Sequence, residues 1–189
     1  MSRKNNLHQE NKKRSKNLEE ILWSLKLGFI AFLISVVMSF ISEVAMKNVN
    51  ILVGTIVILL FVLFGIIFDM IGVAVTSADE APLHAMSSKK IKGAKVAVAL
   101  KKNSSKTSTF CCDVIGDICG IISGAASVVV STQLHEIFQI PLLYSSLLVT
   151  GIVAALTIGG KSLEKPIAIN NGNNILYNFA KIISIFSKN

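Results

Sequence analysis

The sequence predicts an all-α polytopic membrane protein with about four transmembrane helices and juxtamembrane amphipathic helices. Hydrophobic residues make up 52% of the 189 residues and charged residues only 16%, whereas a soluble domain carries about 25% charged residues. The mean hydropathy is +0.63. Charge-free runs at residues 51–68 and 140–160 are long enough to cross a bilayer. This composition argues against a water-soluble enzyme.

The first span is predicted at residues 21–44, after a polar and basic tail at residues 1–20. Lys26 lies one turn inside this span, and a lysine near a helix end reaches the interface with its apolar stem. No small-residue cleavage site closes the apolar stretch. We therefore expect it to remain as a span instead of being removed as a signal peptide.

Three further spans are predicted at residues 51–75, 109–134 and 140–160, since each provides roughly 20 mostly apolar residues. In the connection after the second span, Ser77 or Asp79 is suited to cap a helix that has Pro82 in its first turn. Alternating apolar residues and lysines then predict an amphipathic helix at 82–102. A second one is predicted at 173–187, after an asparagine-rich turn. Both are expected to lie on the membrane or on the bundle.

The net charge of +8 indicates membrane topology and not nucleic-acid binding. Eighteen of the nineteen lysines and arginines fall on one side of the predicted spans, and only Lys47 falls on the other. Short cytoplasmic loops carry the excess of positive charge. We therefore expect both termini in the cytoplasm and the protein in the cell membrane.

Ionisable residues within the spans are the candidate site residues, because each costs roughly 2.5 to 3.5 kcal/mol to insert. Hard cations such as Mg²⁺ take oxygen ligands, usually one or two carboxylates with waters retained. The predicted metal ligands are Asp69, Asp117, Ser162 and Asp113. The alternative is a structural ion pair between Lys161 and an aspartate, which would leave no charge for a metal.

Other polar and small residues receive simpler interpretations. The lone histidines His84 and His135 are expected at the surface, and the cysteines at 111, 112 and 119 are expected to be packing residues. There is no Ser/His/Asp arrangement, phosphate loop or HExxH, so no catalytic or cofactor-binding residue is predicted and the protein is not expected to be an enzyme. The small-residue stripe through Gly116, Gly120 and Gly124 favours tight packing inside the monomer, with a dimer face or a thin wall around an ion path as the alternative.

Four short motifs carry a family resemblance: AVTS at residues 74–77, KGA at 92–94, ICGIISGA at 118–125 and GKSLEKPIA at 160–168. In their order and spacing they resemble the transmembrane domain of the CNNM/CorC family of magnesium transporters, over about residues 50–187. The resemblance implies Mg²⁺ as the bound or transported ion. It also implies that the paired CBS domains, which usually follow in this family, would come from a separate protein.

The departures from the family pattern fall on the expected ion ligands. Asp69 stands at the position of the family's ion-binding serine, and Gly72 replaces the motif glutamate that follows. Asp117 stands in a region often occupied by asparagine. Lys161 stands where the family has the glutamate of its Gly-Glu-x-x-Pro-Lys motif, and a lysine there would repel a cation.

Three functions are consistent with these patterns. The leading one is a stand-alone CNNM/CorC-like membrane domain that binds or transports a divalent cation. The second is a non-transporting membrane subunit or scaffold, with the Lys161 pair as structure and span three docking a partner. The third is action at an anionic membrane surface through Lys89, Lys90, Lys92 and Lys95. The lipid bilayer is the expected partner, and a homodimer is a further candidate.

Overall fold

The computed structural model describes residues 2–46 and 49–186, and all the regular structure in these ranges is helical. The prediction of an all-α polytopic membrane protein is confirmed. Four stretches are long and apolar enough to span a bilayer: Ile21–Val44, Ile51–Ser77, Ser104–Phe138 and Leu142–Asn170. Lys47, Lys188 and the last residue of the predicted 173–187 helix lie outside the described residues.

The chain divides into two compact units, Met1–Met38 and Ser39–Asn189. Helix α1 (Ser2–Met46) forms the first unit as far as Met38 and continues to Met46 at the start of the second unit. The first unit contains most of the first span, and no described residue interrupts the helix between the basic tail and the apolar stretch. Lys26 therefore lies on a continuous helix that leads from the tail into the membrane.

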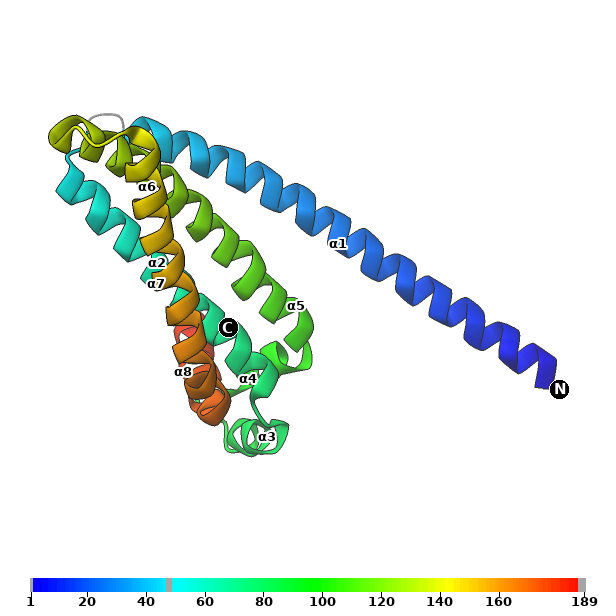
Figure 1. Cartoon of the computed structure of the whole chain (residues 1–189). Helices are drawn as coiled ribbons and strands as arrows, with labels where there is room; N and C mark the ends of the chain where they lie inside the picture. The colour runs from blue at the N-terminus through cyan, green and yellow to red at the C-terminus, as the bar shows by residue number, and fades with distance from the viewer. Residues whose placement is uncertain (1, 47–48, 187–189) are drawn as a thin grey trace. The chain divides into compact units, whose positions relative to one another are not determined.

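Three helices of the second unit form a bundle: α2 (Ile51–Ser77), α6 (Gly116–Phe138) and α7 (Leu142–Asn170). Each of the three helices packs on the other two, and the contacts that α2 makes with α6 and α7 are the most extensive (Figure 1). An apolar core joins the three helices in the half of the bundle nearer the α6–α7 connection; it contains Ile58, Val62, Ala126, Val130 and Val149. This core fixes the register of the three helices.

The remaining short helices gather at the other end of the bundle (Figure 1). We call α3 (Glu80–Ser88), α4 (Ala94–Lys102) and α8 (Gly172–Phe186) the collar. A second apolar core fastens the collar to the end of α2; it contains Ile71, Val75, Ala78, Leu83, Ala97, Cys111, Leu176 and Ala180. The apolar faces predicted for the two amphipathic segments therefore pack largely on the bundle.

Polar contacts also hold the collar to the bundle. The Lys101 ammonium of α4 donates hydrogen bonds to the carbonyl oxygens of Thr76 (2.8 Å) and Val75 (3.3 Å) at the end of α2. This places a positive charge at the negative end of the helix dipole. The backbone N–H of Asp79 donates to Asn173 Oδ1 at 2.8 Å, so the entry to α3 is held by the first turn of α8.

Two boundaries differ from the sequence prediction. The segment 82–102 is not one helix, because Lys90 (φ 54°) and Gly93 (φ 88°) adopt left-handed conformations between α3 and α4. Glycine is required at the second position, since a Cβ on Gly93 would lie 2.8 Å from the Cα of Lys181 in α8. Helix α7 does not end near residue 160. It continues through Pro166 to Asn170, because glycine alone does not end a helix whose backbone must stay internally bonded in lipid.

Candidate functional site

A charged cluster lies between α2 and α7, and we call Asp69, Lys161 and Glu164 the charged cluster. Lys161 Nζ donates to Asp69 Oδ1 at 3.4 Å. Glu164 lies one turn after Lys161, is only 5% exposed, and has no hydrogen-bond partner for either carboxyl oxygen among the described residues. Asp69, Lys165 and Lys161 are close enough to act electrostatically on the Glu164 carboxyl, and the Asp69 carboxylate can accept a hydrogen bond from Glu164 when Glu164 is protonated. The Lys161 ammonium forms its ion pair with Asp69, and Glu164 is the second carboxyl beside that pair.

The surroundings of the charged cluster make its charges costly. Asp69 is 7% exposed and is positioned along α2 between the two apolar cores, with Val62 on one side and Ile71 on the other. A buried carboxylate is tolerated when it is paired and hydrogen-bonded, and an uncompensated one is strongly unfavourable. With both carboxylates ionised, Asp69, Lys161 and Glu164 together have a net charge of −1, which either a proton on Glu164 or a bound cation would offset.

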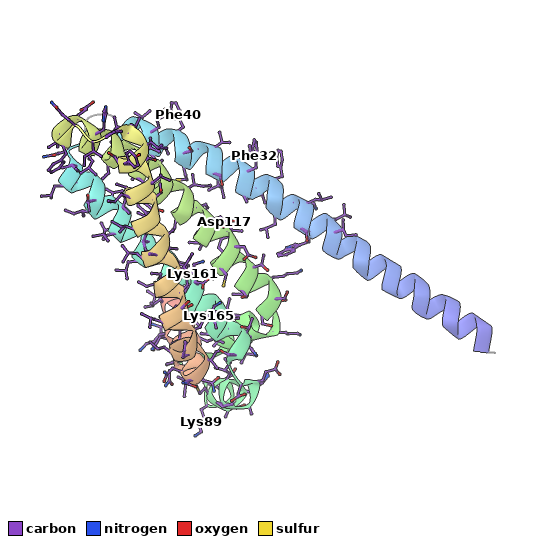
Figure 2. All side chains as sticks on the ribbon, in the orientation of Figure 1. Phe32, Phe40, Lys89, Asp117, Lys161 and Lys165 are labelled. Carbon is purple, nitrogen blue, oxygen red and sulfur yellow. The ribbon has the colours of Figure 1, made fainter. Side chains whose placement is uncertain are left out.

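Lys161 connects the charged cluster to an open cleft on the side of the bundle. Its side chain is 34% exposed, and a Cβ on Gly116 of α6 would lie 3.7 Å from its Nζ atom. The cleft has a volume of about 560 Å³, and Asp117, Ser123 and Thr157 line it together with Lys161. Figure 2 labels Asp117 on α6 and Lys161 on α7. Apolar residues and glycines make up most of the lining, neither Asp69 nor Glu164 lines the cleft, and Lys161 is the member of the charged cluster that reaches it.

A π-helical segment positions α6 against the charged cluster. Helix α5 (Ser104–Thr109) leads into the π-helix η1 (Phe110–Ile115), which packs on α2 and continues as α6. The Cys112 thiol donates to the backbone carbonyl of Asp69 at 3.6 Å. Gly72 permits this approach, because a Cβ there would overlap Cys112 Sγ and lie 3.3 Å from the backbone oxygen of Ser108. Single π-helical turns are rare and are found frequently at functional sites.

The structure brings together only some of the residues predicted as ligands. Asp69 belongs to the charged cluster and Asp117 lines the cleft, whereas Asp113 and Ser162 are exposed and do not line it. Among the described residues, no group of three or more His, Cys, Asp or Glu side chains is arranged to hold a metal ion. Any protein ligand set for a cation is therefore limited to two carboxylates, with the other positions left to water or backbone oxygens.

Sequence reasoning did not place Glu164 among the site residues. It assigned the family's glutamate position to Lys161, whereas the buried carboxylate on α7 is Glu164. The available signal was helical spacing: residues three apart share a helix face, so Glu164 follows Lys161 toward α2 once the helix continues past Gly160. The prediction of a helix end near residue 160 hid that relation.

Two glycines of the stripe on α6, Gly120 and Gly124, do not pack inside the monomer as favoured from sequence, whereas Gly116 is half-buried beside Lys161. A Cβ on Gly120 or Gly124 would meet nothing within 4 Å, and both residues are exposed. The side of α6 that packs in the bundle contains Cys119, Ile122, Ser123, Ala126, Ser127, Val130 and Ser131. The period of the apolar and serine residues, and not that of the glycines, decides which face is buried. The open glycine face leaves the dimer interpretation as a prediction.

Fold and site together define a polytopic all-α membrane protein with a charged cluster inside its helix bundle. Comparison with known protein families, with curated proteins and with solved structures gives no match for this chain. The resemblance to the CNNM/CorC family therefore remains a prediction from the sequence motifs.

Proposed function

We propose that the protein binds a divalent cation, preferably Mg²⁺, at Asp69 and Glu164 and transports it across the membrane. The observation that carries the proposal is the buried Glu164 carboxyl, whose oxygens accept no hydrogen bond from the described residues and which lies beside the Asp69–Lys161 pair. Mg²⁺ is commonly held by one or two carboxylates while it keeps several waters. The cleft lined by Asp117 supplies an approach for such a partly hydrated ion.

In this proposal Lys161 competes with the ion. Its ammonium pairs with Asp69 when the site holds no cation and moves toward the cleft, which Asp117 also lines, when the ion binds. The partial exposure of Lys161 gives its side chain room for this movement. Ion binding and pairing with Lys161 then exclude one another, and the charge of the buried site changes from −1 with the ammonium to 0 with Mg²⁺.

The alternative function is a non-transporting membrane subunit. The specific observation in its favour is the Asp69–Lys161 ion pair itself, which lowers the cost of burying both groups. Glu164 would then be held in its neutral, protonated form. The open glycine face of α6 would be the docking surface for a partner or a second copy.

Isothermal titration of Mg²⁺ into the purified full-length protein separates the two functions. We expect saturable binding that is lost in Asp69→Asn and Glu164→Gln and is tightened in Lys161→Met, which removes the competing ammonium. Glu136→Gln is the matched control, because Glu136 is exposed and outside the charged cluster. Absence of binding in both the unaltered protein and Lys161→Met would refute the cation site and favour the structural pair.

Transport is tested separately in proteoliposomes that contain a Mg²⁺-sensitive dye. With the unaltered protein, we expect the dye signal to rise when external Mg²⁺ is added. With Glu164→Gln, the signal should not exceed that of vesicles without protein. Binding without flux would restrict the function to ion binding.

The orientation of the protein is part of the proposal. The excess of lysine and arginine on one side of the spans favours a cytoplasmic collar and cytoplasmic termini, which would put the charged cluster in the inner half of the bilayer. The assignment is tested with a protease or a cysteine-labelling reagent added to one side of sealed vesicles. Access to the collar from the outer side of the cell membrane would reverse the orientation.

A further inference from the structure

Positive charge is concentrated on the outer surface of the collar and of the connection between α3 and α4, where Glu80, which lines a pocket with Lys102, is the acidic residue. Five exposed lysines lie there: Lys89, Lys90, Lys92, Lys95 and Lys102. Among the described residues, none of these five lysines has a carboxylate within 4.0 Å. Figure 2 shows Lys89 at the far end of the collar, pointing away from the bundle. This surface requires a negatively charged partner.

The connections of the collar place this surface at the membrane boundary. Helix α2 ends at Ser77, only a few residues before α3, and α4 is followed by the span that starts at Ser104. The segment from α3 to α4 is therefore tied at both ends to helices that cross the bilayer. Lys102 lies two residues before the span that starts at Ser104, and the other four lysines lie 9 to 13 residues from the nearer span end.

An apolar residue within the basic turn favours lipid as the partner. Ile91 is 38% exposed and stands between Lys90 and Lys92. The left-handed conformations of Lys90 and Gly93 separate α3 from α4, and Ile91 lies in the turn between them, where its backbone N–H donates to the carbonyl oxygen of Met86. At a bilayer surface, the phosphates lie outside the acyl chains. Lysines that flank an exposed isoleucine are suited to such a surface, because the ammoniums can contact the phosphates and the isoleucine can contact the acyl chains.

We propose that the 89–95 segment of the collar is a binding surface for anionic phospholipid headgroups of the leaflet that it faces. The lysine ammoniums pair with the headgroup phosphates, and Ile91 enters the acyl region between them. Lys101 takes no part, because the carbonyls at the end of α2 already hold it. This inference does not depend on the cation site, since it rests on different residues at a different level of the bundle.

The test uses the full-length protein in neutral dodecyl maltoside micelles doped with equal amounts of phosphatidylglycerol and phosphatidylcholine. Native mass spectrometry then counts the lipids that stay bound. We expect a preference for phosphatidylglycerol, reduced by about tenfold or more when Lys89, Lys90, Lys92 and Lys95 are all changed to Gln, because each surface lysine contributes about 1 kcal/mol. The same four residues changed to Arg should keep the preference.

A matched control removes equal charge elsewhere. The quadruple variant of Lys12, Lys13, Arg14 and Lys16 to Gln should retain the preference. Equal loss in both quadruple variants would show general attraction by net charge and would overturn the proposal, as would an unchanged preference after loss of the collar lysines. If the quadruple collar variant does not fold, the single changes Lys92→Gln and Lys95→Gln give the same comparison, each with a smaller expected loss. Water-soluble glycerophosphate should not compete, and competition by it would indicate a phosphate site instead of a lipid surface.

Discussion

The substitution Glu164→Gln should raise the stability of the protein when no divalent cation is present. Glu164 is 5% exposed, and neither of its carboxyl oxygens has a hydrogen-bond partner among the described residues. An unsatisfied buried polar group costs about 1–3 kcal/mol, and more when it is charged. Glutamine keeps the shape of the side chain and removes the charge. We expect the free energy of unfolding to rise by about 1–2 kcal/mol, since the buried charge is removed and the amide can donate to the Asp69 carboxylate.

Added Mg²⁺ should reverse the order of the two proteins. A ligand at about 100 times its Kd stabilises the native state by about 2.7 kcal/mol. Only the unaltered protein has the full carboxylate pair, so it should become the more stable one. The assay is unfolding by sodium dodecyl sulfate in mixed micelles, followed by circular dichroism, with chelator or with saturating Mg²⁺.

The control for this experiment is Glu136→Gln, which should change the free energy of unfolding by less than about 0.5 kcal/mol because the residue is exposed. If Glu164→Gln is less stable than the unaltered protein in chelator, the carboxylate makes favourable contacts and the argument from its orphaned oxygens is wrong. If Glu164→Gln is more stable in chelator but Mg²⁺ changes the stability of neither protein, the buried Glu164 carboxyl is destabilising and Mg²⁺ does not bind to it.

Three further substitutions test the packing, each measured by the same unfolding assay. Gly93→Ala should cost about 2–4 kcal/mol, because it adds left-handed strain and a Cβ 2.8 Å from the Cα of Lys181; an unaltered midpoint would contradict the packing of α4 on α8. Lys101→Met should cost about 1–2 kcal/mol through the lost bonds to α2, and no loss would show that the apolar core alone holds the collar. Gly120→Ala should be neutral or stabilise by up to about 1 kcal/mol, since no atom lies within 4 Å; a clear loss would mean that another surface packs on that face.

The four spans could be predicted from sequence because the bilayer imposes a length and a polarity that each segment shows by itself. Composition and charge-free runs placed all four, and the structure extends the second, third and fourth. The amphipathic segments were also visible, since their apolar periodicity is local. The break at Gly93 was not, because it depends on the close approach of Lys181 from a helix almost ninety residues away.

The charged cluster shows the same division. The sequence by itself determined that Asp69, Asp117 and Lys161 would lie within membrane-spanning helices, since hydropathy and position along the chain are enough for that. Only the tertiary structure decided that Asp69 meets Lys161 and that Glu164 is buried beside them without a partner. The physical reason is rotation about the helix axis: hydropathy gives the depth of a residue in the membrane, whereas packing of α2, α6 and α7 decides which side of each helix faces inward.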